Sequence, residues 1–183
     1  MMSAHRLSSV SPPAALIDSA VRWIHGLRDD LLTGSRTLTA AERVLFAPHF
    51  PVAVLRSVRI AVVDAVASPA LSDAARASRL DRLLDFSDLE ALTLVDTIVL
   101  VRAGMPAPAH IMSLLFHELV HVTQFRQVGC VGFVDRYLHD WLASRYDYGA
   151  IRAERQAFAL ESRFTRRPGR SVPVARLVSR AMC

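Results

Sequence analysis

The sequence contains no lysine and only two cysteines, Cys130 and Cys183, among its 183 residues. Two cysteines are too few for the disulfide framework of a small secreted protein, and no Cys-x-x-Cys pair is present to bind a metal. No apolar run reaches the roughly 20 residues needed to cross a bilayer. The first 30 residues contain no continuous apolar segment with a small-residue cleavage site. We therefore expect no signal peptide, no membrane span and, by default, a cytoplasmic location.

All 22 basic residues are arginines, and the formal net charge is +5. The planar guanidinium fork suits phosphates and carboxylates. The arginines are spread along the sequence, however, whereas nucleic-acid-binding proteins usually concentrate them on one face, often with aromatic residues. We attribute the bias to GC-rich coding DNA and expect no nucleic-acid partner. The densest cluster, RFTRRPGR at 163–170, is interpreted as part of a basic, solvated tail over 165–183.

The chain is 52% hydrophobic, which is sufficient for a buried core. Its length suits one domain, which we expect to span 1–183 and to begin with a loose arm over 1–13. Apolar residues recur at spacings of three and four between residues 14 and 32, which predicts an amphipathic helix. Thr39 and Glu42 form a capping-box pattern before a second helix, which Pro48 and Pro51 are expected to stop.

Two stretches rich in β-branched residues predict strands over 57–66 and 92–101, with a helix over 70–86 between them. A long apolar helix over 109–127 follows, and Gly129 is placed to end it. A further helix begins near Phe133, and another runs from Ile151 to about Arg163. The prediction is an α+β fold, mostly helical, in which a small mixed or antiparallel sheet packs on the central apolar helix.

The central helix contains LLFHELVHVTQF at 114–125, in which His117, Glu118 and His121 form a His-Glu-x-x-His motif. Residues i and i+4 share one helix face, about 5–6 Å apart at Cβ, so two imidazoles can converge on one zinc ion per chain. Glu118 is rotated about 100° from His117 and is predicted to act as general base. The alternative is a pair of core histidines satisfied by hydrogen bonds, because unpartnered burial of such groups costs about 2–7 kcal/mol each.

A third ligand must come from further along the chain, because Gln124 and Gln127 occupy the last two positions of the longer His-Glu-x-x-His-x-x-Gly-x-x-His motif. Glu154 is the first choice and Glu161, two turns later, the main alternative. Glu154 borders the predicted buried face of its helix, formed by Ala153, Ala157, Phe158 and Leu160. Three residues of the intervening helix remain open as ligands: Asp135, His139 and Asp140.

Stabilisation of a transition state also requires a hydrogen-bond donor near the oxyanion. Tyr148 is our first candidate, with Tyr146 and His139 as alternatives. The competing interpretation is that the tyrosines pack against the helix. Gln124, one turn after His121, is expected either to brace a ligand or to be a buried amide bonded to backbone.

The segments HELVHVTQFRQVG (117–129) and YGAIRAERQAF (148–158) resemble the zincin metallopeptidases, on the gluzincin branch with two histidines and one glutamate. They are more closely similar to small bacterial zincin-like proteins of unassigned function. The resemblance covers about residues 92–163 and implies a zincin-like fold. It also implies His117, His121 and Glu154 as zinc ligands and Glu118 as catalytic base.

The same resemblance implies that the strand DTIVLV (96–101) borders a cleft, where an extended peptide adds to the sheet edge. One departure from the pattern is Arg152-Ala153 before Glu154, where similar proteins often carry Asn-Pro. The expected function is that of a zinc-dependent hydrolase, a metallopeptidase acting on a peptide or protein. The alternatives are a non-catalytic zincin-like module for metal or protein binding, and a basic module that binds nucleic acid or an anionic surface.

Overall fold

The computed structural model describes residues 11–67, 89–102, 108–167 and 169–182. The predicted helix over 70–86, and residues 1–10 of the predicted arm, lie outside these ranges. A long first helix is followed by two short helices and the four strands, and the elements from residue 108 onwards are all helical. In chain order the elements are α1 (Ala14–Leu32), β1 (Arg36–Thr37), α2 (Ala40–Phe46), α3 (Val52–Ser57), β2 (Arg59–Val63), β3 (Ala91–Leu94), β4 (Thr97–Val101), α6 (Pro108–Ala143), η2 (Tyr148–Ala150), α7 (Arg152–Arg166) and α8 (Val174–Met182).

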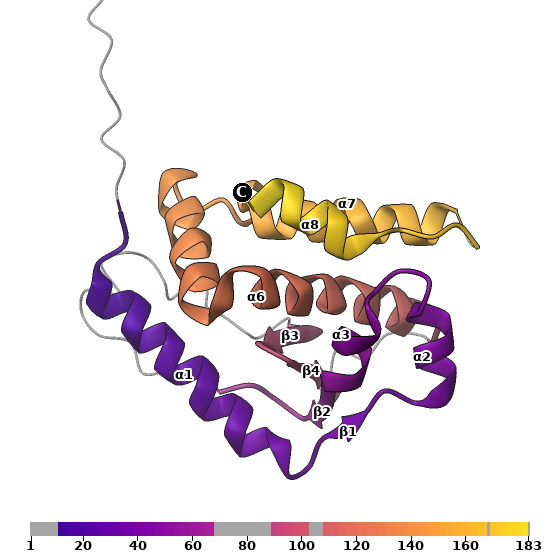
Figure 1. The fold of residues 1–183 in the computed structure, drawn as a ribbon. Coiled ribbons are helices and arrows are strands. Elements are labelled where there is room, and N and C mark those ends of the chain that lie inside the picture. Colours follow the sequence, from indigo (N-terminus) through magenta and orange to yellow (C-terminus); the bar gives the residue numbers. More distant parts are fainter. Residues whose placement is uncertain (1–10, 68–88, 103–107, 168, 183) are drawn as a thin grey trace, which may run out of the picture.

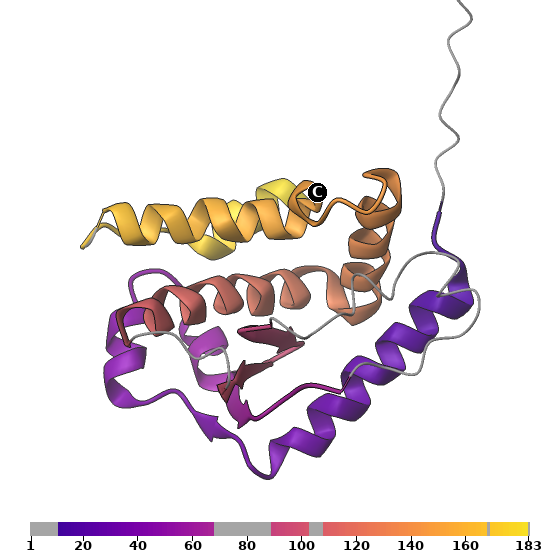
Figure 2. The ribbon, with the colours of Figure 1, turned by 180° about the vertical axis from the view of Figure 1, so that it is seen from behind.

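Helix α6 forms the middle layer, with the sheet on one side and α7 and α8 on the other (Figure 1). The view from behind shows the same order of layers (Figure 2). Every residue from 115 to 125 is buried, as expected for a helix that is apolar around its whole circumference. Although α6 is long, no helix in the described ranges combines the length and apolarity needed to cross a membrane. The His-Glu-x-x-His segment therefore lies in the centre of the protein.

The sheet has the order β1-β2-β4-β3 and is mixed, with β2 parallel to β4 and the other two pairs antiparallel. The α+β prediction is confirmed at this level. The single predicted strand over 92–101 is wrong, however, because the chain reverses at Val95 and Asp96 and pairs Leu94 with Thr97. Arg28 of α1 binds both carboxylate oxygens of Asp96, at 2.6 and 2.9 Å, and so holds this turn.

The hairpin changes which strand borders the sheet. The segment DTIVLV was expected at the edge, but β4 lies between β2 and β3, and β3 is the outer strand. No glycine marks the turn in the sequence. Val95 has a φ of 61°, which is uncommon for a β-branched residue, so propensity alone favours a continuous strand.

Gly129 divides α6 as predicted. Its φ of 74° and ψ of 168° are not helical, and the chain after it runs in a different direction from the first part of the helix (Figure 1). A positive φ is far less costly for glycine than for other residues. The two predicted helices, over 109–127 and from Phe133, are therefore the two parts of α6.

The end of the chain differs from the predicted solvated tail. Helix α7 continues to Arg166, and α8 packs on α6 with Val174 and Val178 fully buried. The backbone N–H of Val172 donates to Nδ1 of His49 at 3.0 Å and fastens the connection between the two helices. Exposed arginines alternate with these valines, so the apolar face of α8 is narrow and was not recognised in the sequence.

Candidate metal centre

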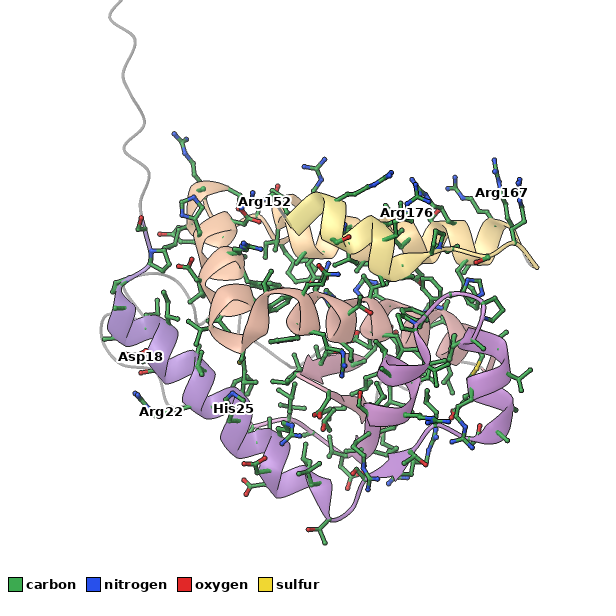
Figure 3. The ribbon with its side chains drawn as sticks, in the orientation of Figure 1. Asp18, Arg22, His25, Arg152, Arg167 and Arg176 are labelled. Carbon is green, nitrogen blue, oxygen red and sulfur yellow. The ribbon has the colours of Figure 1, made fainter. Side chains whose placement is uncertain are left out.

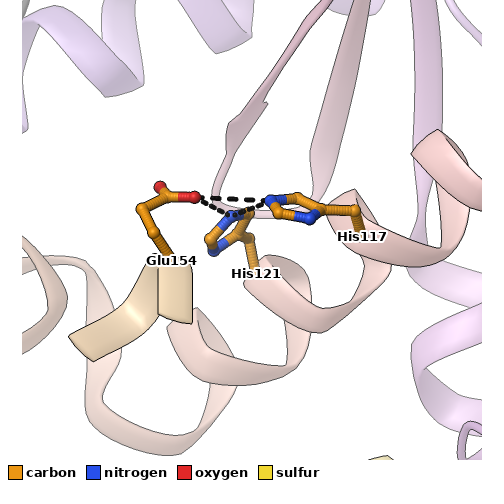
Figure 4. A group of neighbouring side chains, drawn as sticks. All are labelled: His117, His121 and Glu154. Carbon is orange, nitrogen blue, oxygen red and sulfur yellow. Dashed lines mark hydrogen bonds and ion pairs between the residues drawn. The ribbon is translucent and has the colours of Figure 1, made fainter. Parts of the chain in front are cut away.

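Three side chains from two helices meet in the buried centre: His117 and His121 of α6, and Glu154 of α7 (Figure 4). The two Nε2 atoms lie 3.1 Å apart, and Oε2 of Glu154 lies 3.3 Å from each of them. All three residues are 4–6% exposed. Within the described ranges, this is the one group of three potential metal ligands that lie so close together.

The local structure explains why these groups meet. One helical turn separates His117 from His121, which places both rings on the same face of α6. Glu154 lies in the first turn of α7, where the helix dipole favours a negative charge. In place of the absent Asn-Pro start signal, Asp140 of α6 accepts a hydrogen bond from the backbone N–H of Arg152 at 3.0 Å. The preceding helix therefore caps the turn that carries Glu154.

The second ring nitrogen of each histidine faces a hydrogen-bond acceptor. His117 Nδ1 lies 3.1 Å from Oε2 of Glu161, and an ionised carboxylate can only accept. His121 Nδ1 lies 2.8 Å from Oε1 of Gln124. The Gln124 amide is oriented by its Nε2, which donates to the carbonyl of Ala153 at 3.0 Å. In the neutral imidazoles both Nδ1 atoms therefore carry the hydrogen, and each Nε2 has a lone pair.

With these tautomers, two Nε2 lone pairs and a carboxylate oxygen face one another, which is repulsive unless a cation lies among them. A tetrahedral zinc ion with bonds of about 2.0–2.1 Å has ligands about 3.3–3.4 Å apart. The observed separations of 3.1–3.3 Å are close to these values. The donor set therefore fits a zinc ion whose fourth position is left for water or substrate.

The electrostatics of the protein alone also favour positive charge here. Burial opposes the charged form of His117, but hydrogen bonds to Glu154 and Glu161 outweigh burial and raise its pKa to about 10. Burial likewise opposes charge on His121, and the Glu154 carboxylate nevertheless raises its pKa. Burial also disfavours ionised Glu154, but the charge of His121 and hydrogen bonds from both histidines hold its pKa well below the usual range. The site accordingly attracts protons or a metal cation.

Glu118 lies beside the three convergent groups without joining them. The hydroxyl of Thr93 on β3 donates to Oε2 of Glu118 at 2.6 Å and lies 3.2 Å from its backbone carbonyl. The negative charge of Glu118 contributes to the raised pKa values of His117, His121 and Tyr148. Glu118 is thus a buried carboxylate that directly follows His117 in α6 and is held by a strand residue.

Two tyrosine hydroxyls approach Glu154. Tyr137 donates to Oε1 of Glu154 at 2.7 Å, while Oε2 faces the histidines. The Tyr148 side chain is partly exposed, but burial of its phenol group and the charge of Glu154 raise its pKa. Tyr148 therefore keeps its O–H at neutral pH and can donate a hydrogen bond, as the predicted oxyanion donor must.

The other candidate ligands lie elsewhere. Glu161, the main alternative for the third position, bonds the far nitrogen of His117 instead. Asp140 is engaged in capping α7. Asp135 is exposed and His139 half-buried, and neither belongs to the cluster. Both expectations for Gln124 are met, because its Oε1 lies against Nδ1 of His121 and its Nε2 donates to the backbone carbonyl of Ala153.

Two aromatic residues near the site differ in role. Tyr146 packs against Trp141, with ring centroids 5.6 Å apart, as the packing interpretation of the tyrosines expected. Phe158 was expected in the buried face of α7 but is 52% exposed. Its ring lies edge-on to that of His117 at 4.6 Å, so it lines the border of the site rather than the core.

Sequence reasoning missed Thr93 and Tyr137 as residues of this site. Thr93 belongs to a stretch that was predicted as one strand, where threonine is common and signals nothing further. Tyr137 lies one turn after Phe133 in the helix predicted from that residue, where an aromatic side chain indicates packing. The one available signal was its hydroxyl group, because a buried tyrosine usually finds a hydrogen-bond partner.

We predict that replacing Glu161 with alanine weakens zinc binding by about 10- to 100-fold, the usual effect of removing a group that orients a metal-binding histidine. Glu161→Gln should retain more affinity, because the amide oxygen still accepts from Nδ1 of His117. Zinc affinity is measured by competition with a chromogenic chelator. Glu90→Gln, which changes an exposed glutamate, is the control. Equal affinity in Glu161→Ala and the parent protein would contradict this role.

Comparison with known protein families, with curated proteins and with solved structures finds no match to this chain. The case for a metal centre therefore depends on the geometry described above. Its strongest element is the convergence of two Nε2 lone pairs with the Oε2 atom of Glu154 in a buried, hydrogen-bonded setting.

Proposed function

We propose that the protein is a zinc-dependent hydrolase, most specifically a metallopeptidase. In this proposal His117, His121 and Glu154 bind zinc, and Glu118 is the general base. The observation that carries the proposal is the arrangement of these four residues: three donor atoms lie 3.1–3.3 Å apart, and the buried Glu118, which directly follows His117, is held by Thr93.

The donor set alone does not select one metal, because two imidazoles and a carboxylate also suit iron and other divalent ions. The adjacent Glu118 favours hydrolysis, since a base next to the ligands is what activation of water requires. When bound, zinc would supply Lewis acidity, which lowers the pKa of a water ligand to about 7 and polarises a carbonyl oxygen.

The protein groups have distinct proposed roles. Glu118 accepts a proton from the attacking water and returns it to the departing amine, while Thr93 fixes its Oε2. Tyr148 donates a hydrogen bond to the developing oxyanion. An extended peptide that pairs with the outer strand β3 would run alongside Thr93, the strand residue that hydrogen-bonds to Glu118. This arrangement supports a peptide as substrate.

The second candidate is a non-catalytic metal-binding module. The observation in its favour is that the site is buried, which limits access for a substrate. Glu118 is only 5% exposed, and the three proposed ligands are similarly buried. A metal there would stabilise the packing of α7 against α6. Such a module would bind zinc and lose stability in chelator, but it would not hydrolyse peptides.

Metal analysis tests the proposal directly. Protein purified without chelator is expected to contain about one zinc per chain, and its melting temperature should fall after dialysis against chelator. A metal at 100 times its dissociation constant adds about 2.7 kcal/mol to the free energy of unfolding, a readily measured shift. Peptide-library cleavage then separates the hydrolase from the module. Zinc-free protein with an unchanged melting temperature after zinc addition would exclude both.

A further inference from the structure

The net positive charge of the protein is concentrated in its last two helices and the segment that joins them. Residues 152–182, here called the α7–α8 layer, contain eight arginines and two carboxylates, whereas the rest of the chain has fourteen arginines and fifteen carboxylates. The layer therefore carries +6 and the remainder −1. A GC-rich coding bias explains arginine in place of lysine, but not this separation of charge. The basic stretch expected at 165–183 is thus the end of a longer one, which begins at Arg152.

All the arginines of this layer are exposed, and both of its carboxylates point inward. Glu154 and Glu161 hydrogen-bond to His117, so neither neutralises the outer surface. Of the eight arginines, Arg152 alone forms an ion pair within the described residues, with Asp140. The eight are Arg152, Arg155, Arg163, Arg166, Arg167, Arg170, Arg176 and Arg180. Figure 3 shows three of them, Arg152, Arg167 and Arg176, along the layer.

The scarcity of exposed large apolar and aromatic side chains on the described part of this surface limits the classes of partner that it suits. Membrane-surface helices bury exposed apolar side chains among the lipids, but Val174, Leu177 and Val178 of α8 pack on the core. Single-stranded nucleic acids are usually stacked on aromatic side chains placed among the basic ones. Within the described part of the layer, the one exposed large apolar side chain is Phe158, which lies at the border of the metal centre. An extended, carboxylate-rich chain requires neither feature.

We propose that the α7–α8 layer docks an acidic segment of the protein substrate. This inference deepens the proposed hydrolase function and rests on it. Arg155 follows the proposed ligand Glu154 directly, so the basic surface and the metal centre share one rigid helix. Arg155 and Arg166 are eleven residues apart, which places them in one row about 17 Å long. In an extended peptide, carboxylates on one side that are four to six residues apart span roughly 13–20 Å, a range that includes this distance.

The direct test is binding of a fluorescent Glu-Ser repeat peptide, compared with a Gln-Ser peptide of the same length, by anisotropy at several salt concentrations. The Arg155→Gln/Arg163→Gln/Arg166→Gln variant is expected to bind the acidic peptide about tenfold more weakly, from three lost charge pairs at an exposed surface. The matched control, Arg22→Gln/Arg56→Gln/Arg126→Gln, removes the same charge elsewhere and should change binding less than about twofold. Melting curves verify that both variants fold.

Three results would overturn the proposal: equal binding of the two peptides, equal weakening in the control variant, or tighter binding of an RNA oligonucleotide or of phosphatidylserine vesicles through the same arginines. The measurement is repeated on chelator-treated protein, because docking needs no metal. If the protein is not a hydrolase, binding of the acidic peptide can still be measured. If the acidic peptide does not bind, zinc content and turnover are unaffected. If both hold, the variant should raise KM for an acidic substrate and leave kcat unaltered.

Discussion

Replacing Glu118 with glutamine is expected to reduce peptide hydrolysis by about 100- to 10,000-fold while the protein keeps its zinc. The amide has nearly the shape of the carboxylate and still accepts the hydrogen bond from Thr93, so the packing between β3 and α6 should persist. It cannot accept a proton from water at neutral pH. The measurement is kcat on a cleaved peptide together with zinc content per chain.

A second substitution, Thr93→Val, tests the residue that positions the Glu118 carboxylate and leaves the proposed base itself in place. Thr93→Val removes the hydroxyl that fixes the Glu118 carboxylate but leaves the carboxylate itself. A smaller loss of kcat is expected, with zinc retained and the general base still present. If hydrolysis survives Glu118→Gln at the level of the unmodified protein, Glu118 is not the base and the mechanism proposed above is wrong.

Replacing Glu154 with glutamine is expected to weaken zinc binding by roughly a thousandfold, more than the 10- to 100-fold loss typical of removing a group behind a ligand. The carboxylate supplies the negative charge that offsets a divalent ion among two neutral imidazoles. It also accepts from the Tyr137 hydroxyl, which an amide oxygen can still do. The variant should therefore fold and bind little zinc, as calorimetric titration of metal-free protein will show.

Glu42→Gln provides the matched control for that experiment. Glu42 is also a buried glutamate, but it lies in α2 and pairs with Arg36 at 2.7 and 2.8 Å. Its replacement is expected to lower the melting temperature without changing zinc affinity. Similar zinc affinity in Glu154→Gln and the parent protein would exclude Glu154 as a ligand. The structure offers Glu161 as the next carboxylate to test.

Local sequence was sufficient for the features that depend on neighbouring residues. The capping box of Thr39 and Glu42 and the break at Gly129 are short-range features, and both are present as predicted. The spacing of His117 and His121 likewise places two rings on one face through helix geometry alone. The hairpin at Val95 was not predictable in this way, because a long-range contact from Arg28 to Asp96 holds it against local propensity.

The sequence by itself determined the helix that presents two imidazoles and a carboxylate, because period and side-chain chemistry are written in adjacent residues. Only the tertiary structure decided what those groups meet. It brought Glu154 to both Nε2 atoms and Glu161 to the opposite ring nitrogen, although the two glutamates share one face of α7. The sequence concentrates the excess arginine in residues 152–182, and the tertiary structure turns those side chains outward. Such contacts depend on how α7 and α8 pack on α6. That packing is determined by residues far apart in the chain, so it cannot be derived from any one local stretch.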